Sequence, residues 1–233
     1  HYEIHRMPTD PQQTRQIYRR TGVLQGIGDD YFWFDGVASE RWDSIYPESC
    51  TGPDTQAPPN IKAREVCPVP GELPWDTLEN AAKAGWRLAG VHICGSEAAR
   101  AFFQMIDNAR AVNGWSMEDV RSMRLTGEHC NVIGKQPDII QGLKDYGVYL
   151  SCGPNYLHDV REWINDYGPQ IEDFLLPFNT YIESGVKLVG QHFASGATRQ
   201  GTQRFQPPFY MLWLSVSRQY DGEVWQPDER IDR

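Results

Sequence analysis

The stretch Lys144-Asp145-Tyr146-Gly147-Val148-Tyr149-Leu150-Ser151 shows the pattern that decides the fold, because it joins a helix end to a short apolar strand through one glycine. The same order occurs at Ala84-Gly85-Trp86 and at Ser184-Gly185-Val186. Glycine ends a helix in the left-handed conformation without a steric penalty. The strands that follow are unbroken apolar runs, which are typical of parallel sheets covered by helices. The sequence therefore predicts an α/β fold with right-handed crossovers.

Helices and strands alternate along most of the chain. We expect helices over residues 11–20, 75–84, 97–113, 138–146, 176–184 and 208–219, and a short helix capped by Ser116. We expect strands over residues 31–34, 86–91, 123–128, 148–151 and 186–189. Such strands fit an open sheet or a TIM-type (β/α) barrel. We favour an incomplete barrel of about the last five βα units, as one domain over residues 1–233, because polar side chains follow the strands at the active face of such barrels.

A long proline-rich loop over residues 38–73 interrupts this alternation. Loops of this length are usually functional or packed against another part of the structure. We expect the loop to cover the site at the strand ends or a neighbouring chain, with Ile45, Tyr46 and Ile61 buried.

The composition excludes several partners. The 233 residues include 31 acidic and 22 basic side chains, which give a formal net charge of −9. Nucleic acids and anionic membranes bind basic surfaces, so we expect neither as a partner. The longest apolar run, Phe209–Leu214, is too short to cross a membrane. The first residues lack the apolar segment of a signal peptide, so we expect a cytoplasmic chain that, starting at His1, is a processed product or a piece of a longer protein.

The five cysteines are an odd number, so they cannot form a fully paired disulfide framework. Cys50 and Cys67 flank a proline-rich part of this loop and can pair if the protein is exported. We favour free thiols in a reducing cytoplasm, because a chain of this length does not need a disulfide to be stable.

Three histidines follow predicted strands: His92, His129 and His192. The carboxyl ends of parallel strands meet at one rim, and neutral imidazole nitrogens are common metal ligands. Three histidines from three strands can make an open tetrahedral metal site, whereas the alternative is that each one packs and hydrogen-bonds in the core. We predict that the ring nitrogens of His92 and His129 lie within roughly 7 Å of each other and that His192 lines the same cavity.

Other polar side chains are predicted at the same rim. Asp35 and Glu128 can act as a base or orient a metal-binding histidine, although Asp35 also fits a simple turn with the glycine that follows it. Cys94 and Cys130 are further candidates, but a cysteine at such a position is more often a small buried apolar residue. Asn155 follows the strand over 148–151 and is a candidate for contact with substrate or with a metal ligand.

Several stretches occur in the order and spacing of a known family. They are Phe34-Asp35-Gly36, Val91-His92-Ile93-Cys94-Gly95, Glu128-His129-Cys130, Glu183–Gly190 and Pro207–Arg218. Over about residues 71–231 the chain resembles the amidohydrolase superfamily, and within it the metal-dependent hydrolases of amidohydrolase family 3, the YtcJ-like branch. The resemblance implies that His92 and His129 are metal ligands on the fifth and sixth strands of a barrel.

The same resemblance implies hydrolysis of an amide-like C–N bond in a small molecule by a metal-activated water. The cofactor would be a divalent metal, zinc in the first place, with iron or manganese as alternatives. His192 stands where the family has a catalytic aspartate, and it would act as a third ligand or as the general base. The family's His-x-His is absent and Tyr31 replaces its bridging lysine, so a non-catalytic relative that binds a ligand or partner chain stays open as an alternative.

An incomplete barrel leaves strand edges unpaired, and such edges invite association. We therefore expect a complementary chain that carries the missing strands, or a second copy of this chain, to cover the edge at Tyr31–Phe34.

Overall fold

A parallel sheet of six strands organises the computed structural model, which describes residues 2–3, 16, 20, 24–32, 34–39, 41–45, 47–190, 196–197, 203–204 and 208–231. The strands are β1 (Tyr2–Glu3), β2 (Val37–Ser39), β3 (Leu88–Gly95), β4 (Thr126–Val132), β5 (Tyr149–Cys152) and β6 (Lys187–Gly190). Every neighbouring pair in this sheet is parallel. The predicted α/β class with a parallel sheet is confirmed.

Helices connect and cover the strands. They are α2 (Pro59–Lys62), α3 (Leu73–Lys83), α4 (Ser96–Asn113), α5 (Met117–Ser122), α6 (Pro137–Asp145), α7 (Val160–Tyr167), α8 (Phe178–Glu183) and α9 (Pro208–Ser217). Most of the predicted helices from α3 onward are confirmed to within a few residues, including the cap of α5 by Ser116. The prediction missed α7, which lies between the 3-10 segments Pro154–Asp159 and Pro169–Phe174. Most of the helix predicted over 11–20 lies outside the described residues.

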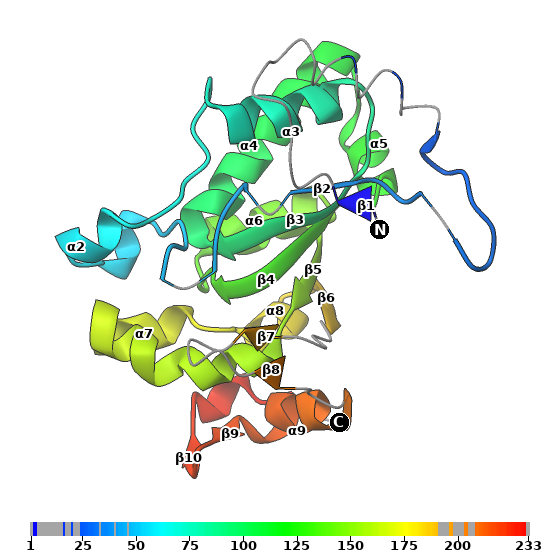
Figure 1. Cartoon of the computed structure of the whole chain (residues 1–233). Helices are drawn as coiled ribbons and strands as arrows, with labels where there is room; N and C mark the ends of the chain where they lie inside the picture. Colours follow the sequence, from blue (N-terminus) through cyan, green and yellow to red (C-terminus); the bar gives the residue numbers. More distant parts are fainter. Residues whose placement is uncertain are drawn as a thin grey trace.

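The strands lie side by side in the order in which they follow one another along the chain. In a doubly wound sheet this order reverses at a switch point. Right-handed crossovers without a reversal place successive helices on the same face, as in consecutive βα units of a barrel. In Figure 1, α3 and α4 lie above β3 and β4, while α7 and α9 lie below the last strands. The described sheet is open, with β1 and β6 as its edges.

The two faces of the sheet differ in burial. One register row is fully buried: Val91, Gly127 and Leu150. The next row points to the opposite face and is half-buried or exposed: His92, Glu128, Ser151 and Val189. Since partners in one row of a parallel sheet share a face, the first face packs on the helices and the second is open.

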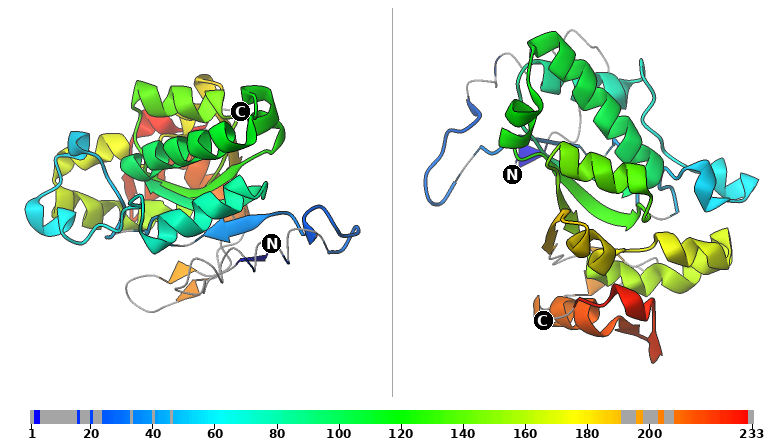
Figure 2. Two further views of the ribbon diagram at one scale, coloured as in Figure 1. Left: turned by 90° about the horizontal axis from the view of Figure 1, so that it is seen from above. Right: turned by 180° about the vertical axis from the view of Figure 1, so that it is seen from behind.

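The strand predicted over 31–34 is wrong. Tyr31 is 98% exposed and Phe32 is 62% exposed, in a loop where the backbone N–H groups of both donate to Asp29 Oδ1. Figure 2 shows this part of the chain, in blue, projecting from the body of the molecule. The strand is β2 instead, and Gly36 precedes it because a Cβ there would lie 2.3 Å from the backbone oxygen of Arg87. The sheet edge on this side is therefore β1, not Tyr31–Phe34.

The proline-rich loop packs against α4 and the end of β3. Trp42 is fully buried and its Nε1 donates to the backbone oxygen of Ala98 at 3.1 Å. Ile61 is buried as predicted, whereas Ile45 is 38% exposed, contrary to the prediction. Tyr46 lies outside the described residues.

Two disulfides are present, which corrects the prediction of free thiols. Cys50 pairs with Cys67 across the loop, and Cys130 pairs with Cys152 between β4 and β5. Cys94 is a free, buried thiol. Disulfides are rare in cytosolic proteins, so the cysteines do not support the expected cytoplasmic location.

Helix α9 carries apolar side chains on both of its sides. Met211 and Leu214 are buried against the rest of the chain. The other side presents an exposed apolar stripe with the spacing of one helix face: Phe209, Leu212, Trp213 and Val216. Within the described residues, no helix is both long and apolar enough to cross a membrane.

The carboxylate of Glu229 ties the end of the chain to α8. It accepts hydrogen bonds from the backbone N–H and the hydroxyl of Thr180, at 3.0 and 2.6 Å, and pairs with Lys135 Nζ at 2.8 Å. These partners hold the pKa of Glu229 below its ordinary value of 4.5, although burial acts in the opposite direction. A carboxyl group with a lowered pKa stabilises the fold above its unfolded pKa, and this contribution is lost as the pH falls through the folded pKa.

We predict that Glu229→Gln lowers the free energy of unfolding by about 1–3 kcal/mol at neutral pH, because buried donors lose a charged acceptor. The difference from the unsubstituted chain should shrink as the pH falls below 4.5. Urea unfolding at several pH values measures both effects. Glu183→Gln on the exposed side of α8 is the matched control, and an equal loss of stability in that variant would contradict the prediction.

Candidate metal centre

Two histidines meet on the open face of the sheet. His92 lies in β3 and His129 in the adjacent strand β4, with 2.8 Å between their Nε2 atoms and an angle of 87° between the rings. The predicted convergence of these side chains is confirmed. Both residues lie within their strands, whereas the sequence placed them just after the strand ends.

A break in the regular conformation of β4 turns His129 toward the face that His92 and Glu128 share. Consecutive residues of a strand normally point to opposite faces, which would separate Glu128 from His129. Here His129 and Cys130 have φ angles of 78° and 44°, and the pairing register shifts between Ile93 and Gly95 of β3. A bulge of this kind re-aims side chains. As a result, one ligand atom from each of His92, Glu128 and His129 lies within 4.8 Å of the other two.

Behind the histidines, Tyr156 binds the far side of the His129 ring. Its hydroxyl lies 2.7 Å from Nδ1 of His129, and the side chain is mostly buried in the 3-10 segment Pro154–Asp159. Burial raises the pKa of Tyr156 well above its usual range, and the nearby negative charges of Asp159 and Glu128 act in the same direction. Tyr156 therefore stays a neutral phenol at this position.

Asp43 holds the end of β3 in place. Its carboxylate is fully buried and accepts four backbone N–H groups: those of Ser44 and Cys50 on Oδ1, and those of Cys94 and Gly95 on Oδ2. Burial raises the pKa of Asp43 to about 7, and the four N–H groups oppose that rise. Gly95 is required at this contact, because a Cβ there would lie 2.0 Å from the backbone oxygen of Cys50.

The other predicted site residues lie in different surroundings. Asp35 is misplaced by the sequence reading, because it precedes β2 and pairs with Arg87 at the amino end of the sheet. Cys94 is buried with its thiol pKa raised well above the ordinary value by burial, so it fits the alternative of a small apolar residue. Cys130 is in a disulfide and has no free thiol. Asn155 is buried next to Tyr156, and His192 lies outside the described residues.

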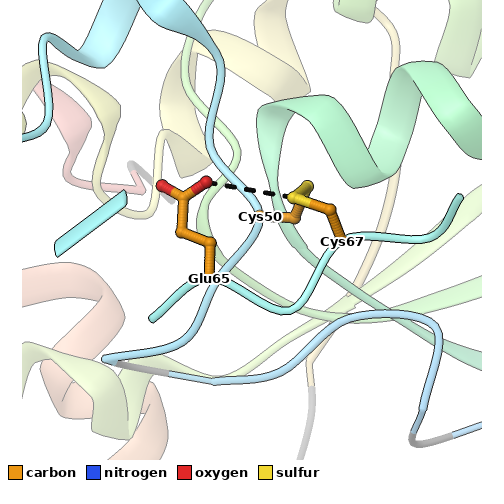
Figure 3. Close-up of side chains that lie close together, drawn as sticks. All are labelled: Cys50, Glu65 and Cys67. Carbon is orange, nitrogen blue, oxygen red and sulfur yellow. Dashed lines mark hydrogen bonds between the residues drawn. A yellow bond between two sulfur atoms is a disulfide. The ribbon is translucent and has the colours of Figure 1, made fainter. Parts of the chain in front are cut away.

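A second group of potential ligands lies in the proline-rich loop. Figure 3 shows the carboxylate of Glu65 directed toward the disulfide between Cys50 and Cys67, with 3.9 Å between Glu65 Oε2 and Cys67 Sγ. Metal binding requires thiolates, and the disulfide has none. Glu65 is instead engaged by Lys62 Nζ at 2.7 Å. This group is therefore not a metal site in the disulfide-bonded protein.

The side chains of His92, Glu128 and His129 are chemically suited to bind a divalent metal ion. Two imidazoles and one carboxylate are a common ligand set for catalytic zinc and for non-haem iron. Two nitrogens bound to one tetrahedral zinc at ~2.1 Å would lie about 3.4 Å apart. The Nε2 atoms, now 2.8 Å apart, would need to separate slightly.

No family model and no curated protein matches this sequence. Solved structures match at the level of the fold. An uncharacterized metal-dependent hydrolase from Pyrococcus furiosus has a TM-score of 0.60 at 14% identity, and another from Pyrococcus horikoshii OT3 has a TM-score of 0.61 at 13% identity. Each comparison covers 94% of this chain and 41% of the other, so the chain spans less than half the length of either protein.

The sequence reading missed Tyr156 and Asp43. Tyr156 reaches His129 only because the segment after β5 folds back over the bulge in β4. Asp43 lies in a loop, where an aspartate is most often a turn residue. No local sequence pattern distinguishes Asp43 from such a turn residue, because its partners on β3, Cys94 and Gly95, lie far along the chain.

We predict that Asp43→Asn lowers the free energy of unfolding by about 2–5 kcal/mol, because the new amide group faces two buried N–H donors that lose their acceptor. Chemical denaturation measures the loss. Asp173→Asn, at an exposed position, should change stability by less than about 0.5 kcal/mol. Equal stabilities of the two variants would show that Asp43 does not hold the loop on β3.

Proposed function

We propose that this chain carries the metal centre of a hydrolase of the amidohydrolase type, close to amidohydrolase family 3, which cleaves an amide-like C–N bond in a small molecule. The observation that carries the proposal is the convergence of His92, Glu128 and His129 on the open face of a parallel sheet. These three side chains would hold one divalent ion, zinc in the first place, with iron or manganese as alternatives.

The fold supports this proposal. Consecutive parallel strands without a reversal are the arrangement of a (β/α) barrel, and we propose that the described sheet is part of one. In barrel enzymes, the functional side chains lie toward the carboxyl ends of the strands. The two Pyrococcus proteins of similar fold are described as metal-dependent hydrolases. The sequence motifs around His92 and His129 point to the same class.

The residues around the centre have distinct tasks. A bound divalent ion would act as a Lewis acid and lower the pKa of water. His92 and His129 would present their Nε2 atoms to the ion, and Tyr156 contacts the other nitrogen of the His129 ring. Glu128 adds a negative charge, and a carboxylate oxygen that does not bind the ion would accept a proton from a reacting water. His192 is proposed as a further base, on the basis of its position in the family pattern alone.

The open face gives a substrate access to this group. Ser151 is the register partner of Glu128 on β5 and is half-buried, as are Glu128 and His92. A substrate carbonyl on this face would reach the three ligands without passing through the helix layer. Substrate contacts are therefore proposed on the side of Ser151, away from the buried row of Leu150.

We predict that the purified chain binds near-stoichiometric zinc and that Glu128→Gln loses it on dialysis, because the ligand set then lacks its charged oxygen. Zinc at 100 times its dissociation constant should stabilise the chain by about 2.7 kcal/mol, a rise of roughly 5–10 °C in melting temperature. Elemental analysis and thermal melts with and without a chelator measure these effects. Glu118→Gln, at an exposed position on α5, is the matched control.

Hydrolysis of N-acyl amino acids and cyclic amides, assayed on the metal-loaded chain, tests the reaction class. Metal-dependent cleavage that is lost in Glu128→Gln and kept in Glu118→Gln supports a hydrolase. Metal binding without cleavage would favour the non-catalytic relative, and a chain that binds no metal would overturn the proposal.

We also propose that a second polypeptide with further βα units pairs with the open edges of the sheet and covers the apolar stripe of α9. Phe209 is 83% exposed and Leu212 is 61% exposed, and α9 contains no charged residue that would oppose association. Contiguous exposed apolar side chains often mark an interaction surface. Without such a partner, the same stripe would bring copies of this chain together.

We predict that the isolated chain elutes as an assembly larger than 26.7 kDa and that Leu212→Glu shifts it toward the monomer, because the new charge would be buried in the contact. Size-exclusion chromatography with light scattering measures the mass. Val112→Glu, which changes an exposed apolar residue on α4, should leave the mass unchanged. A soluble monomer with a cooperative melt would contradict this prediction.

A further inference from the structure

We propose that Cys50, Glu65 and Cys67 form a second metal site, which the disulfide keeps closed and a thiol reductant opens. In the oxidised chain the two sulfur atoms are bonded to each other. In the reduced chain they would present two thiolates, beside one carboxylate, to a zinc ion. The site shares no ligand with the histidine centre, so this inference goes beyond the proposed function and does not depend on it.

The three side chains already meet at one point of the proline-rich loop, as Figure 3 shows. One ligand atom from each lies within 4.8 Å of the other two, and Glu65 Oε2 lies 3.9 Å from Cys67 Sγ. A carboxylate oxygen and a sulfur bound to the same tetrahedral zinc would lie about 3.5 Å apart, and two sulfurs about 3.8 Å apart. After reduction, the sulfur atoms would therefore separate while the carboxylate would move only slightly.

Backbone hydrogen bonds hold both cysteines in place independently of the disulfide. The N–H of Cys50 donates to Asp43 Oδ1 at 2.8 Å. Next to Cys67, the N–H of Val66 donates to the backbone oxygen of Glu48 at 2.8 Å. Because these contacts do not involve the sulfur atoms, the two cysteines would stay close together after the bond between them is broken. The reduced loop is therefore organised for a metal ion before the ion binds.

The surroundings of Glu65 suit a ligand that carries charge. Its side chain is only 3% exposed, its Oε2 lies 2.7 Å from Lys62 Nζ, and its Oε1 accepts from the hydroxyl of Thr51. Outer partners of this kind commonly orient a ligating carboxylate, and each of its oxygens keeps a further lone pair for a metal. Two thiolates and one carboxylate carry three negative charges, which a zinc ion and the Lys62 ammonium together would balance.

A cavity gives a small thiol access to this disulfide. Its volume is about 330 Å³, within the range of small-molecule sites. The residues that line it include Cys50, Lys62, Cys67, Trp75 and Arg100. Cys67 is half-buried, whereas Cys130 and Cys152 of the other disulfide are 0% and 1% exposed. A reductant should therefore reach the disulfide of the loop first.

A dithiol would open the site in two exchange steps. Its first thiolate attacks Cys67 Sγ, so a mixed disulfide forms and the bond to Cys50 breaks, leaving the Cys50 thiolate. Its second thiolate displaces Cys67, and the reductant leaves as a cyclic disulfide after passing two electrons to the protein. Zinc would then replace the protons of the two thiols, which would be released on binding.

Selective reduction is the first part of the test. The folded chain is treated with dithiothreitol, and samples taken over time are alkylated with iodoacetamide and analysed by peptide mass spectrometry. Cys50 and Cys67 should be labelled well before Cys130 and Cys152, because only the first pair lines a cavity. Simultaneous labelling of all four cysteines, or no labelling of the first pair in the folded chain, would overturn the inference.

Cobalt(II) is the probe in the second part, because thiolate ligands give it a charge-transfer absorption in the near ultraviolet that histidine and carboxylate ligands do not. After removal of the reductant without oxygen, the reduced chain should bind one cobalt with this absorption, and zinc should displace it. The oxidised chain should not show the absorption. Cys67→Ala should abolish it.

Glu65→Gln keeps both cysteines, so it tests the third ligand and stays decisive if Cys67→Ala does not fold. It should weaken cobalt binding to the reduced chain by at least roughly 10–100-fold, the loss typical for an outer partner of a ligand. Glu48→Gln, an exposed carboxylate in the same loop, is the matched control and should leave the affinity unchanged.

A reduced chain without the thiolate absorption, an absorption kept in Cys67→Ala, or an unchanged affinity in Glu65→Gln would overturn the inference. Metal bound to the oxidised chain reports on the histidine centre instead. If the oxidised chain binds no metal and the reduced chain binds cobalt through thiolates, the proposed function fails and this inference stands. Binding to the oxidised chain with no thiolate absorption after reduction would give the opposite result.

Discussion

The candidate site depends on one backbone distortion, the left-handed conformation of His129 and Cys130 in β4. In a regular strand, the side chains of Glu128 and His129 would lie on opposite faces, and one of them would be buried under the helices. Left-handed φ angles at non-glycine residues cost energy and persist only where the surroundings hold them. The arrangement of three potential ligands is therefore a property of the packing around β4.

Several contacts hold this distortion. The disulfide between Cys130 and Cys152 joins the bulge to β5, and the backbone oxygen of Asn131 accepts from Leu176 N–H. On the other side, Asp43 binds the backbone of β3 two residues beyond His92. The loop that carries Asp43 is itself closed by the disulfide between Cys50 and Cys67. The backbone near both histidines is therefore held in place, by Asp43 at β3 and by the disulfide of Cys130 at β4.

The predictions that relied on local pattern were the most accurate. Helix α4 has an unbroken apolar face and ends at Gly114, so its bounds could be read within one residue. The run Tyr31–Phe34 was misread, because aromatic residues favour strands in general but here have no core to pack against. Because that run was read as a strand, Asp35 was predicted at the carboxyl rim of the sheet, whereas it lies at the amino end. The strand β2 has only 3 residues, which is too short for a recognisable pattern of apolar residues.

By itself, the sequence determined the α/β class and the positions of His92 and His129 on neighbouring parallel strands, because glycine-ended helices and apolar runs mark those strands. Only the tertiary structure decided that the bulge in β4 turns His129 toward His92 and Glu128, that Tyr156 supports His129 and that the cysteines pair. Each of these depends on a bulge, a turn or a contact between distant segments. Such features depend on the balance among packing, hydrogen bonding and backbone strain, and the periodicity of the sequence does not reveal that balance.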